Sequence, residues 1–402
     1  MTQVSDPAAQ ASDRNSFLTD PAALSLLLAA VLVITANNTI SPALPGLAAR
    51  FADTPNADFL VRLLVPAPSF AVVLFAPFTG WLGDRIGRAP MFLGGVALFA
   101  ITGGAGALLP SLEATLAARL LMGIGVATIM TAQSALIGDC FDGARRSAFM
   151  GLQTSVRNFG GLVFILLSGW LASLSPRLPF AIYGAAFLVL PLIWVAFGRT
   201  SDRNSAASGT AALPETAPGT PWLIPVLAAS ALQLGVTILF FFLPTQTPFY
   251  AQHLGLSPAM ATSWTLGAAM LCGGFLALSF APLTARLGRA RVLALAFALM
   301  AVGFASFRFA TGLPMLMLAG ACLASGYGLV MPSLIALVLG TAPVARRGLA
   351  TGMLTTGLYL GQVASPFVSQ PAIVGWGWTG AYQAGALVFA GLTAAALLWP
   401  RR

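Results

Sequence analysis

The sequence contains no lysine, and charged residues of any kind make up only 8% of its 402 positions. Hydrophobic residues make up 58%, and the mean hydropathy is +0.87. A soluble domain has about a quarter charged residues, so this chain cannot present an ordinary surface to water. The composition therefore excludes a soluble globular protein and indicates that lipid surrounds most of the chain.

Cysteine and histidine are also scarce. Three cysteines (Cys140, Cys272 and Cys322) show no paired spacing and lie in or beside apolar runs, so the sequence predicts neither a disulfide nor a zinc site. The single histidine, His253, lies outside the apolar runs, and the chain has no HExxH motif and no phosphate-binding loop. The sequence thus favours a protein that is not an enzyme and predicts no cofactor and no metal.

Twelve apolar runs are long enough to cross a bilayer as helices, since each crossing needs about 20 residues. The chain is therefore predicted to be an all-α membrane protein. The predicted spans are 22–44, 61–82, 90–109, 112–138, 147–172 and 178–198, then 222–246, 259–284, 290–310, 313–340, 347–371 and 378–400. Residues 1–21 are polar without the apolar core of a signal peptide, and 199–221 are rich in Ser, Thr, Ala, Pro and Gly. We expect a tail over 1–21, one bundle over 22–198, a linker over 199–221 and a second bundle over 222–402.

The arginines lie mainly in the loops that follow even-numbered spans. These are Arg85, Arg88, Arg145, Arg146, Arg199, Arg203, Arg286, Arg289, Arg291, Arg346 and Arg347. Basic loops stay in the cytoplasm, so the pattern predicts that both termini are cytoplasmic in an inner-membrane protein. The net charge of +9 is therefore a topology signal and does not indicate a nucleic-acid partner.

The two halves of the chain repeat each other. The motif RIGR at 85–88 recurs as RLGR at 286–289, and ARR at 144–146 recurs at 345–347. Both matches have the same offset, half the length of the chain. Two matches in one register predict two pseudo-symmetric bundles of six helices each, an architecture that suits a transporter with a site between its halves.

The segment GWLGDRIGR at 80–88 closely resembles the signature GxLaDrxGrkxxl of the major facilitator superfamily. RLLMGIG at 119–125 and SPALP at 41–45 resemble motifs of its drug/proton antiporter branch, which has twelve spans. The resemblance implies a fold of two six-helix bundles and an activity of secondary active transport, with a small-molecule substrate, protons as coupling ion and one chain as the working unit.

The loop at 80–88 is the candidate for a conformational latch between the halves. The resemblance implies this role for Gly80, Gly83, Asp84, Arg85, Gly87 and Arg88. The glycines permit close approach of helices and a tight turn. The alternative is that the charges only fix topology, although acidic residues contribute little to topology, which favours the latch for Asp84.

Arg157, in the middle of the fifth predicted span, is the main candidate for contact with a substrate. A cation at that depth is costly unless it faces the interior and finds partners, so Arg157 with Asn158 is expected to contact an anionic or polar substrate group or to pair with a titrating carboxylate. The alternative is a structural cation satisfied by helix carbonyls. Seven further polar or aromatic residues are candidates for the same cavity: Asn37, Asn38, Gln233, Trp264, Tyr327, Tyr359 and Gln362.

Arg119 on the fourth predicted span and Asp139 at the cytoplasmic end of that span are candidates for proton coupling. The resemblance assigns coupling to Arg119, and the alternative is that its side chain snorkels outward. No acidic residue lies deep within any predicted span, which departs from the antiporter pattern. Two functions therefore remain open: proton-coupled efflux of amphipathic compounds, and uptake or exchange of an organic anion with Arg157 as counter-charge.

Overall fold

The computed structural model describes residues 17, 19–198, 222–343 and 346–398. The expected linker over 199–221 lies outside these residues, as does most of the expected tail over 1–21. The elements of the first half are α2 (Pro21–Asn38), η1 (Ser41–Ala43), α3 (Leu44–Arg50), α4 (Ala57–Leu63), α5 (Ala67–Ile86), α6 (Arg88–Ala105), α7 (Leu112–Cys140), α8 (Gly143–Leu174), α9 (Phe180–Gly184), η2 (Ala185–Val189) and α10 (Leu190–Phe197). Those of the second half are α11 (Leu223–Phe240), α12 (Phe242–His253), α13 (Pro258–Leu278), α14 (Phe280–Leu287), α15 (Arg289–Arg308), α16 (Leu313–Thr341) and α17 (Arg347–Leu398).

These elements form twelve membrane spans within the described part of the chain. Ten helices are long and apolar enough to cross a membrane, and the pair α4 and the start of α5, bent by 49°, supplies another. The 52 residues of α17 would extend about 78 Å as one helix, far more than the roughly 30 Å of a bilayer core. Its backbone leaves helical geometry at Gly377 (φ 66°, ψ 176°), so α17 is two spans joined by a kink.

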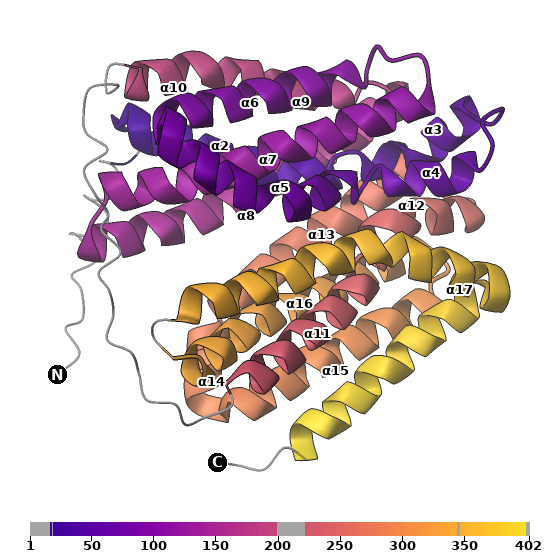
Figure 1. Ribbon diagram of the computed structural model, residues 1–402. Helices are drawn as coiled ribbons and strands as arrows, with labels where there is room; N and C mark the ends of the chain where they lie inside the picture. Colours follow the sequence, from indigo (N-terminus) through magenta and orange to yellow (C-terminus); the bar gives the residue numbers. More distant parts are fainter. Residues whose placement is uncertain (1–16, 18, 199–221, 344–345, 399–402) are drawn as a thin grey trace.

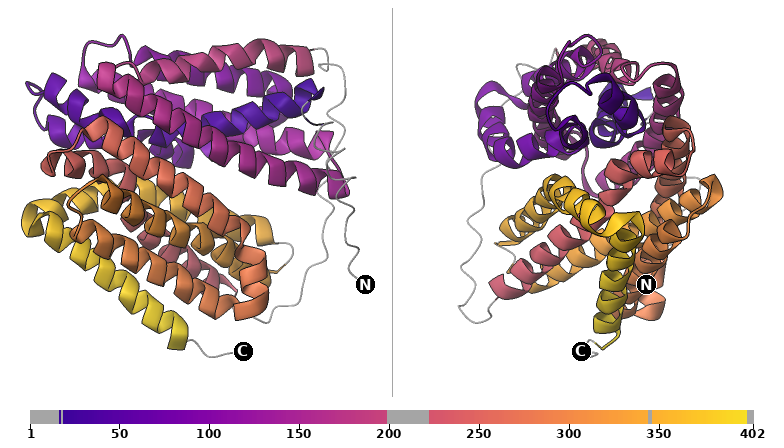
Figure 2. Two further views of the ribbon diagram at one scale, coloured as in Figure 1. Left: turned by 180° about the vertical axis from the view of Figure 1, so that it is seen from behind. Right: turned by 90° about the vertical axis from the view of Figure 1, so that its right-hand side faces the viewer.

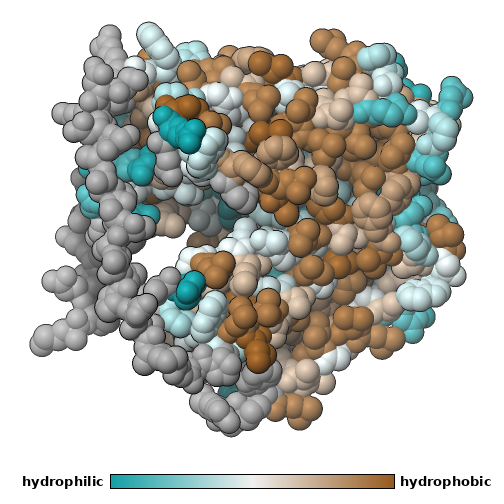
Figure 3. Space-filling view, in the orientation of Figure 1, coloured by the Kyte–Doolittle hydropathy of each residue, from teal (hydrophilic) through white to brown (hydrophobic). Residues whose placement is uncertain are grey.

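The two halves lie side by side with their helices roughly along one direction (Figures 1 and 2). Each half packs around its own hydrophobic core, one centred on residues of α2 to α10 and the other on residues of α11 to α17. The outer surface between the two polar ends is largely apolar (Figure 3). The fold is that of a multi-pass membrane protein.

The sequence repeat is also a structural repeat. The bounds of α16 are those of α7 moved by the offset found in the motifs, and α6 and α15 start one offset apart. Gly87 and Gly288 end α5 and α14 with positive φ angles of 90° and 80°, a conformation that favours glycine. The predicted pseudo-symmetry is therefore confirmed down to the turn that ends the second span of each half.

Local chemistry explains several helix ends. The side chain of Asp20 accepts a hydrogen bond from the backbone N–H of Ala22 (2.9 Å) and caps α2, whose first residue is Pro21. Ser111 caps α7 in the same way, at 3.2 Å from the N–H of Ala114. These caps place the start of each helix close to the residue that the sequence predicts.

Two predicted spans are interrupted. The first was expected to be one helix over 22–44, but α2 ends at Asn38 and η1 separates it from α3. The second was expected to begin at residue 61, but α4 starts at Ala57 and breaks before α5. Pro42 and Pro66 lie at these breaks, and proline lacks the N–H that a continuing helix requires. The breaks free backbone carbonyls that a buried arginine uses, as described below.

Candidate functional site

A cavity of about 930 Å³ lies between the two halves. Its walls come from α5 and α7 of the first half and from α11 and α17 of the second. The lining residues include Val72, Val73, Ala76, Met130, Thr131, Ser134, Leu227, Ser230, Leu234, Gly348, Thr351, Gly352, Thr355, Tyr359 and Leu360. The walls are mainly apolar, with a few hydroxyl groups.

The cavity is wide at one end of the molecule, which we call the arginine-rich end. This end carries Arg85, Arg88, Arg145, Arg146, Arg286, Arg289, Arg346 and Arg347. Lining residues such as Ser134 and Gly348 lie within about two turns of that end, and Figure 3 shows the hollow between the halves there. The cavity therefore opens toward the arginine-rich end.

A cluster of three polar side chains closes the inner end of the cavity. The Asn37 amide of α2 donates to Gln362 Oε1 of α17 (2.9 Å) and to Ser69 Oγ of α5 (3.0 Å). The Ser69 hydroxyl also donates to Gln362 Oε1. Gln362 is only 7% exposed. Two of the predicted cavity residues, Asn37 and Gln362, thus meet each other across the halves.

Arg62 makes a second contact between the halves, closer to the opposite end. Its Nε donates to Gln246 Oε1 of α12 (3.1 Å), and its guanidinium carbon lies 3.6 Å from the centre of the Phe249 ring. Gln246 in turn donates to Ser369 Oγ (2.7 Å), and the rings of Phe59 and Phe367 meet edge to face. The opposite end is therefore closed while the arginine-rich end is open.

Arg157 lies on α8 with an exposed side chain. Tyr359, another predicted cavity residue, lines the cavity, and its hydroxyl lies 3.1 Å from Met130 Sδ. Within the described residues Arg157 makes no hydrogen bond or ion pair. The helix carbonyls that would satisfy a purely structural cation are therefore not bonded to it in this part of the chain. The neighbouring Asn158 lines a separate, smaller pocket between α8 and α13.

The structure places the remaining predicted cavity residues elsewhere. Gln233 is fully buried and donates to Thr237 (2.9 Å) and to the Tyr327 hydroxyl (3.3 Å), so this pair joins α11 to α16 inside the second half. Trp264 is 43% exposed on α13 and does not line the cavity. Asn38 is half-buried beside Asn37.

Arg119 is only 1% exposed, so it does not snorkel outward. Its Nε donates to the carbonyl of Leu64 (2.9 Å) and its Nη2 to the carbonyl of Ala36 (2.5 Å). Its guanidinium also lies over the Tyr183 ring. Ala36 lies in the last turn of α2 and Leu64 directly follows α4, so Arg119 satisfies acceptors near the ends of the broken spans.

The ion pair and the ring contact of the two arginines at the loop between α5 and α6 both lie within the first half. Arg88 forms an ion pair with Asp139 at the end of α7, and Arg85 lies over the Trp81 ring at 4.1 Å. The side chain of Asp84 lies outside the described part of the structure. One residue of the expected latch, Arg88, is therefore paired with Asp139, which was predicted to take part in coupling.

The three glycines of this loop differ in what surrounds them. Gly87 adopts a positive φ and ends α5 in a tight turn, as expected. A Cβ added at Gly83 would lie 2.8 Å from Met91 Sδ, whereas one at Gly80 would meet nothing within 4 Å. The expected close approach of helices at Gly80 is therefore absent in this conformation, because the arginine-rich end is open.

Sequence reasoning missed Ser69, which closes the inner end of the cavity, and Arg62 and Gln246, which close the opposite end. Arg62 falls in the first turn of a predicted span, where an arginine ordinarily reaches the interface and needs no partner. The helix starts at Ala57, four residues earlier than predicted, so Arg62 lies inside the span. A charge inside an apolar span is the sequence feature that could have identified Arg62.

The family model described as Major Facilitator Superfamily matches residues 26–261 and 226–402. The chain belongs to the major facilitator superfamily. It is therefore a membrane transporter, and the family consists of transporters rather than enzymes. The likeness to the drug/proton antiporter branch, predicted from the motifs, is confirmed by the relatives.

Two relatives illustrate this likeness. The chain is 27% identical to the tetracycline resistance protein, class G, of Vibrio anguillarum, over 81% of this chain and 87% of that protein. It is 31% identical to the multidrug efflux pump LfrA of Mycolicibacterium smegmatis over 42% of this chain and 34% of LfrA. Among solved structures, a D-xylose-proton symporter shares the fold with a TM-score of 0.69 at 17% identity, over 91% of this chain and 96% of the symporter.

Proposed function

We propose that this transporter exports small amphipathic molecules across the inner membrane in exchange for protons, as a monomer, with its termini and arginine-rich end in the cytoplasm. The observation that carries the proposal is the cavity between the halves, open at one end and closed at the other. Its volume suits a drug-sized molecule, since small-molecule pockets range from about 300 to 1,000 Å³. With the open end in the cytoplasm, this is the conformation in which an exporter loads its substrate.

The lining of the cavity supports an amphipathic substrate. Its walls are mainly apolar and include leucine, valine, methionine and alanine side chains, and the hydroxyls of Thr131, Ser134 and Ser230 offer separate polar points. Such a surface binds apolar groups through burial and orients them through a few hydrogen bonds. The names of the relatives, which describe tetracycline resistance and multidrug efflux, support export as the direction.

Proton coupling rests on Asp139 and Arg88 in this proposal. Their ion pair joins the candidate latch to the end of α7. Protonation of the Asp139 carboxylate would remove its charge and loosen the loop between α5 and α6. The pair is exposed at the cytoplasmic end of the proposed orientation, where a proton released by each cycle reaches water directly.

A second candidate function is uptake or exchange of an organic anion. Arg157 favours it, because its exposed guanidinium has no hydrogen-bond or ion-pair partner in the described part of the chain, and no carboxylate lines the cavity. A bound anion would supply the missing counter-charge to this cation within a membrane span.

Flux through purified protein in liposomes separates the two functions. An acidic lumen is imposed, and accumulation of a neutral, a cationic and an anionic fluorescent dye is followed with and without the pH gradient. Gradient-driven accumulation of the neutral or cationic dye, abolished by Asp139→Asn, is the expected result. Movement of the anionic dye alone, independent of the gradient and lost in Arg157→Leu, would establish anion exchange instead.

A further inference from the structure

Within the described part of the chain, the polar side chains that line the cavity between the halves all carry hydroxyl groups. They are Thr131 and Ser134 of α7, Ser230 of α11, and Thr351, Thr355, Thr356 and Tyr359 of α17, and we call them the cavity hydroxyls. The other described lining residues are alanine, glycine, valine, leucine and methionine. None of these lining side chains carries a charge or an N–H group.

The cavity hydroxyls already donate their protons to acceptors of the protein itself. Five of them donate to the backbone carbonyl four residues earlier on the same helix, at 2.8 to 3.0 Å: Ser134, Ser230, Thr351, Thr355 and Thr356. Serine and threonine hydroxyls make this bond when they lie inside a helix. A hydroxyl has one proton and two lone pairs, so these five present their lone pairs to the cavity.

The protons of the remaining two cavity hydroxyls are engaged as well. The Thr131 hydroxyl donates to the carbonyl of Ala127 (2.9 Å) or to the hydroxyl of Thr79 (3.0 Å). The Tyr359 hydroxyl donates to Met130 Sδ across the halves (3.1 Å). The described polar groups of the lining therefore act toward a bound molecule as hydrogen-bond acceptors.

The polar cluster at the inner end of the cavity holds a further acceptor. The amide nitrogen of Asn37 donates to Ser69 and to Gln362, whereas its Oδ1 is buried and has no hydrogen-bond partner among the described residues. A buried acceptor without a donor is costly. A substrate donor that reaches this cluster would complete its hydrogen bonding.

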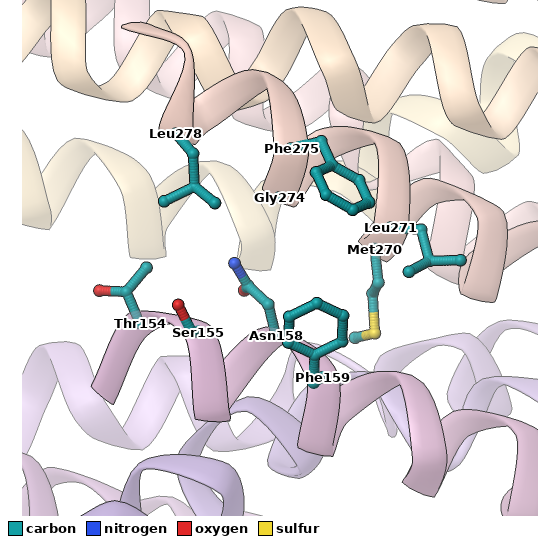
Figure 4. A pocket seen from close by; sticks show the side chains of 9 residues that line it. All are labelled: Thr154, Ser155, Asn158, Phe159, Met270, Leu271, Gly274, Phe275 and Leu278. Atoms are coloured by element: carbon teal, nitrogen blue, oxygen red, sulfur yellow. The ribbon is translucent and has the colours of Figure 1, made fainter. Parts of the chain in front are cut away.

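Three side chains with N–H donors that the sequence predicted for this cavity lie outside its described lining. Asn158 lines the smaller pocket between α8 and α13, where Figure 4 shows its amide directed toward Gly274. The amide nitrogen of Gln233 is bonded inside the second half, and Arg157 is not among the described lining residues. The lining therefore offers a bound molecule none of these donors.

This distribution of acceptors favours one kind of substrate. A polar group that leaves water loses hydrogen bonds and must regain them in the cavity. An N–H or O–H group of a substrate finds free lone pairs there. A carbonyl or carboxylate oxygen finds no free donor in the described lining, because a cavity hydroxyl would first have to give up the bond that it already makes.

We propose that the cavity selects amphipathic substrates that carry several N–H or O–H donors, and that it distinguishes them by the number of donors rather than by charge alone. Ser134, Ser230 and Thr355 place acceptors on three different helices around the cavity, α7, α11 and α17. This inference rests on the proposed export of amphipathic molecules and adds the chemical class of the substrate.

The test compares three fluorescent probes that share a dansyl group and a hexyl linker and differ only in the end group. The first ends in a guanidinium, which has five N–H donors, and the second in a pentamethylguanidinium, which has none. Both keep a permanent positive charge, so charge cannot distinguish them. The third ends in a carboxylate, which has acceptors only.

Initial rates of uptake into liposomes with an acidic lumen are measured with purified protein and corrected for protein-free liposomes. The unmodified protein should move the guanidinium probe roughly tenfold faster than the pentamethyl probe, because methylation removes the charged donors that would bond to the cavity hydroxyls. The carboxylate probe should move no faster than the pentamethyl probe.

A triple variant tests whether the cavity hydroxyls cause this preference. Ser134→Ala, Ser230→Ala and Thr355→Val together remove one acceptor from each of three helices and should lower the preference to about twofold. Thr393→Val is the matched control, since it removes a hydroxyl that makes the same helix bond on α17 (2.8 Å to the carbonyl of Phe389) but does not line the cavity. It should keep the full preference. A preference caused only by the bulk of the methyl groups would persist in the triple variant.

The outcomes distinguish the substrate class from export itself. Equal rates of the two guanidinium probes in the unmodified protein, or an undiminished preference in the triple variant, overturn the role of donors and leave export in place. Should the triple variant fail to fold, Ser230→Ala and Thr355→Val must each lower the preference on their own. Fastest movement of the carboxylate probe overturns the inference in favour of anion exchange. Movement of none of the probes overturns export and the substrate class together.

Discussion

Closure of the opposite end depends on a small number of polar contacts, and Gln246→Leu tests how much they contribute. Gln246 accepts a hydrogen bond from Arg62 across the halves and donates one to Ser369 within the second half. Leucine has a similar size but can make neither bond. Arg62 would keep its contact with the Phe249 ring and its bond to the carbonyl of Asp58.

The expected magnitude follows from the bond that joins the halves. A hydrogen bond from a charged donor contributes about 1.5 to 3 kcal/mol, and each 1.4 kcal/mol is a factor of about ten in an equilibrium. Gln246→Leu should therefore shift the population toward an open opposite end by roughly ten- to a hundredfold. The hydrogen bond between Arg62 and Gln246 stabilises only the conformation described here. Its loss should therefore not destabilise the conformation in which the opposite end is open.

Distances between spin labels would measure this shift. Labels at Asn56→Cys and Gln252→Cys lie on exposed positions of the two halves near the opposite end, in a background without native cysteines. Gln246→Leu should add a population at longer distance. Ser369→Ala is the control, since it removes only the bond within the second half. An unchanged distribution in Gln246→Leu, or an equal change in Ser369→Ala, would refute the reasoning.

Three further outcomes are expected. Arg119→Leu leaves two buried carbonyls without their charged donor and should destabilise the purified protein by about 3 to 5 kcal/mol, so an unchanged thermal midpoint would contradict its structural role. Gly87→Ala forces a positive φ on an L-residue and should lower the free energy of unfolding by about 1 to 3 kcal/mol. Gly80→Ala, in the middle of a helix with free space around it, should be neutral or raise the free energy of unfolding by up to about 1 kcal/mol. Chemical denaturation of the two variants measures both changes. Arg157→Leu should leave the flux of neutral dyes in liposomes within twofold and, under the second candidate function, lower that of anionic dyes at least tenfold. Equal losses of both would show that Arg157 acts on folding or gating instead.

Patterns that depend on local physics could be predicted from the sequence. The twelve spans follow from the length of apolar runs, and the repeated RIGR and RLGR motifs predicted the pseudo-symmetry. Gly87 and Gly288 have the same backbone conformation because the same turn ends both helices. The family, too, could be read from the segment at 80–88, which matches a known loop signature.

Two kinds of feature could not be predicted: which backbone carbonyls are left unpaired, and which face of a helix is turned toward a partner. The role of Arg119 depends on breaks in two other spans, at positions where only the packed structure shows unpaired carbonyls. Asn37 and Gln362 were both expected to line a cavity, yet they bond to each other because the structure has the opposite end closed. Gln233 and Tyr327 face each other inside one half, a choice of helix face that apolar periodicity in lipid does not fix.

The central claim is that this chain exports amphipathic molecules through the cavity between its halves at the expense of a proton gradient. Its most direct test is dye accumulation in liposomes with an acidic lumen, measured together with the luminal pH. Uphill accumulation of a neutral or cationic amphipathic dye with matching loss of luminal protons is the predicted result. Dye movement that equals that of protein-free liposomes, with no change in luminal pH, would contradict the account.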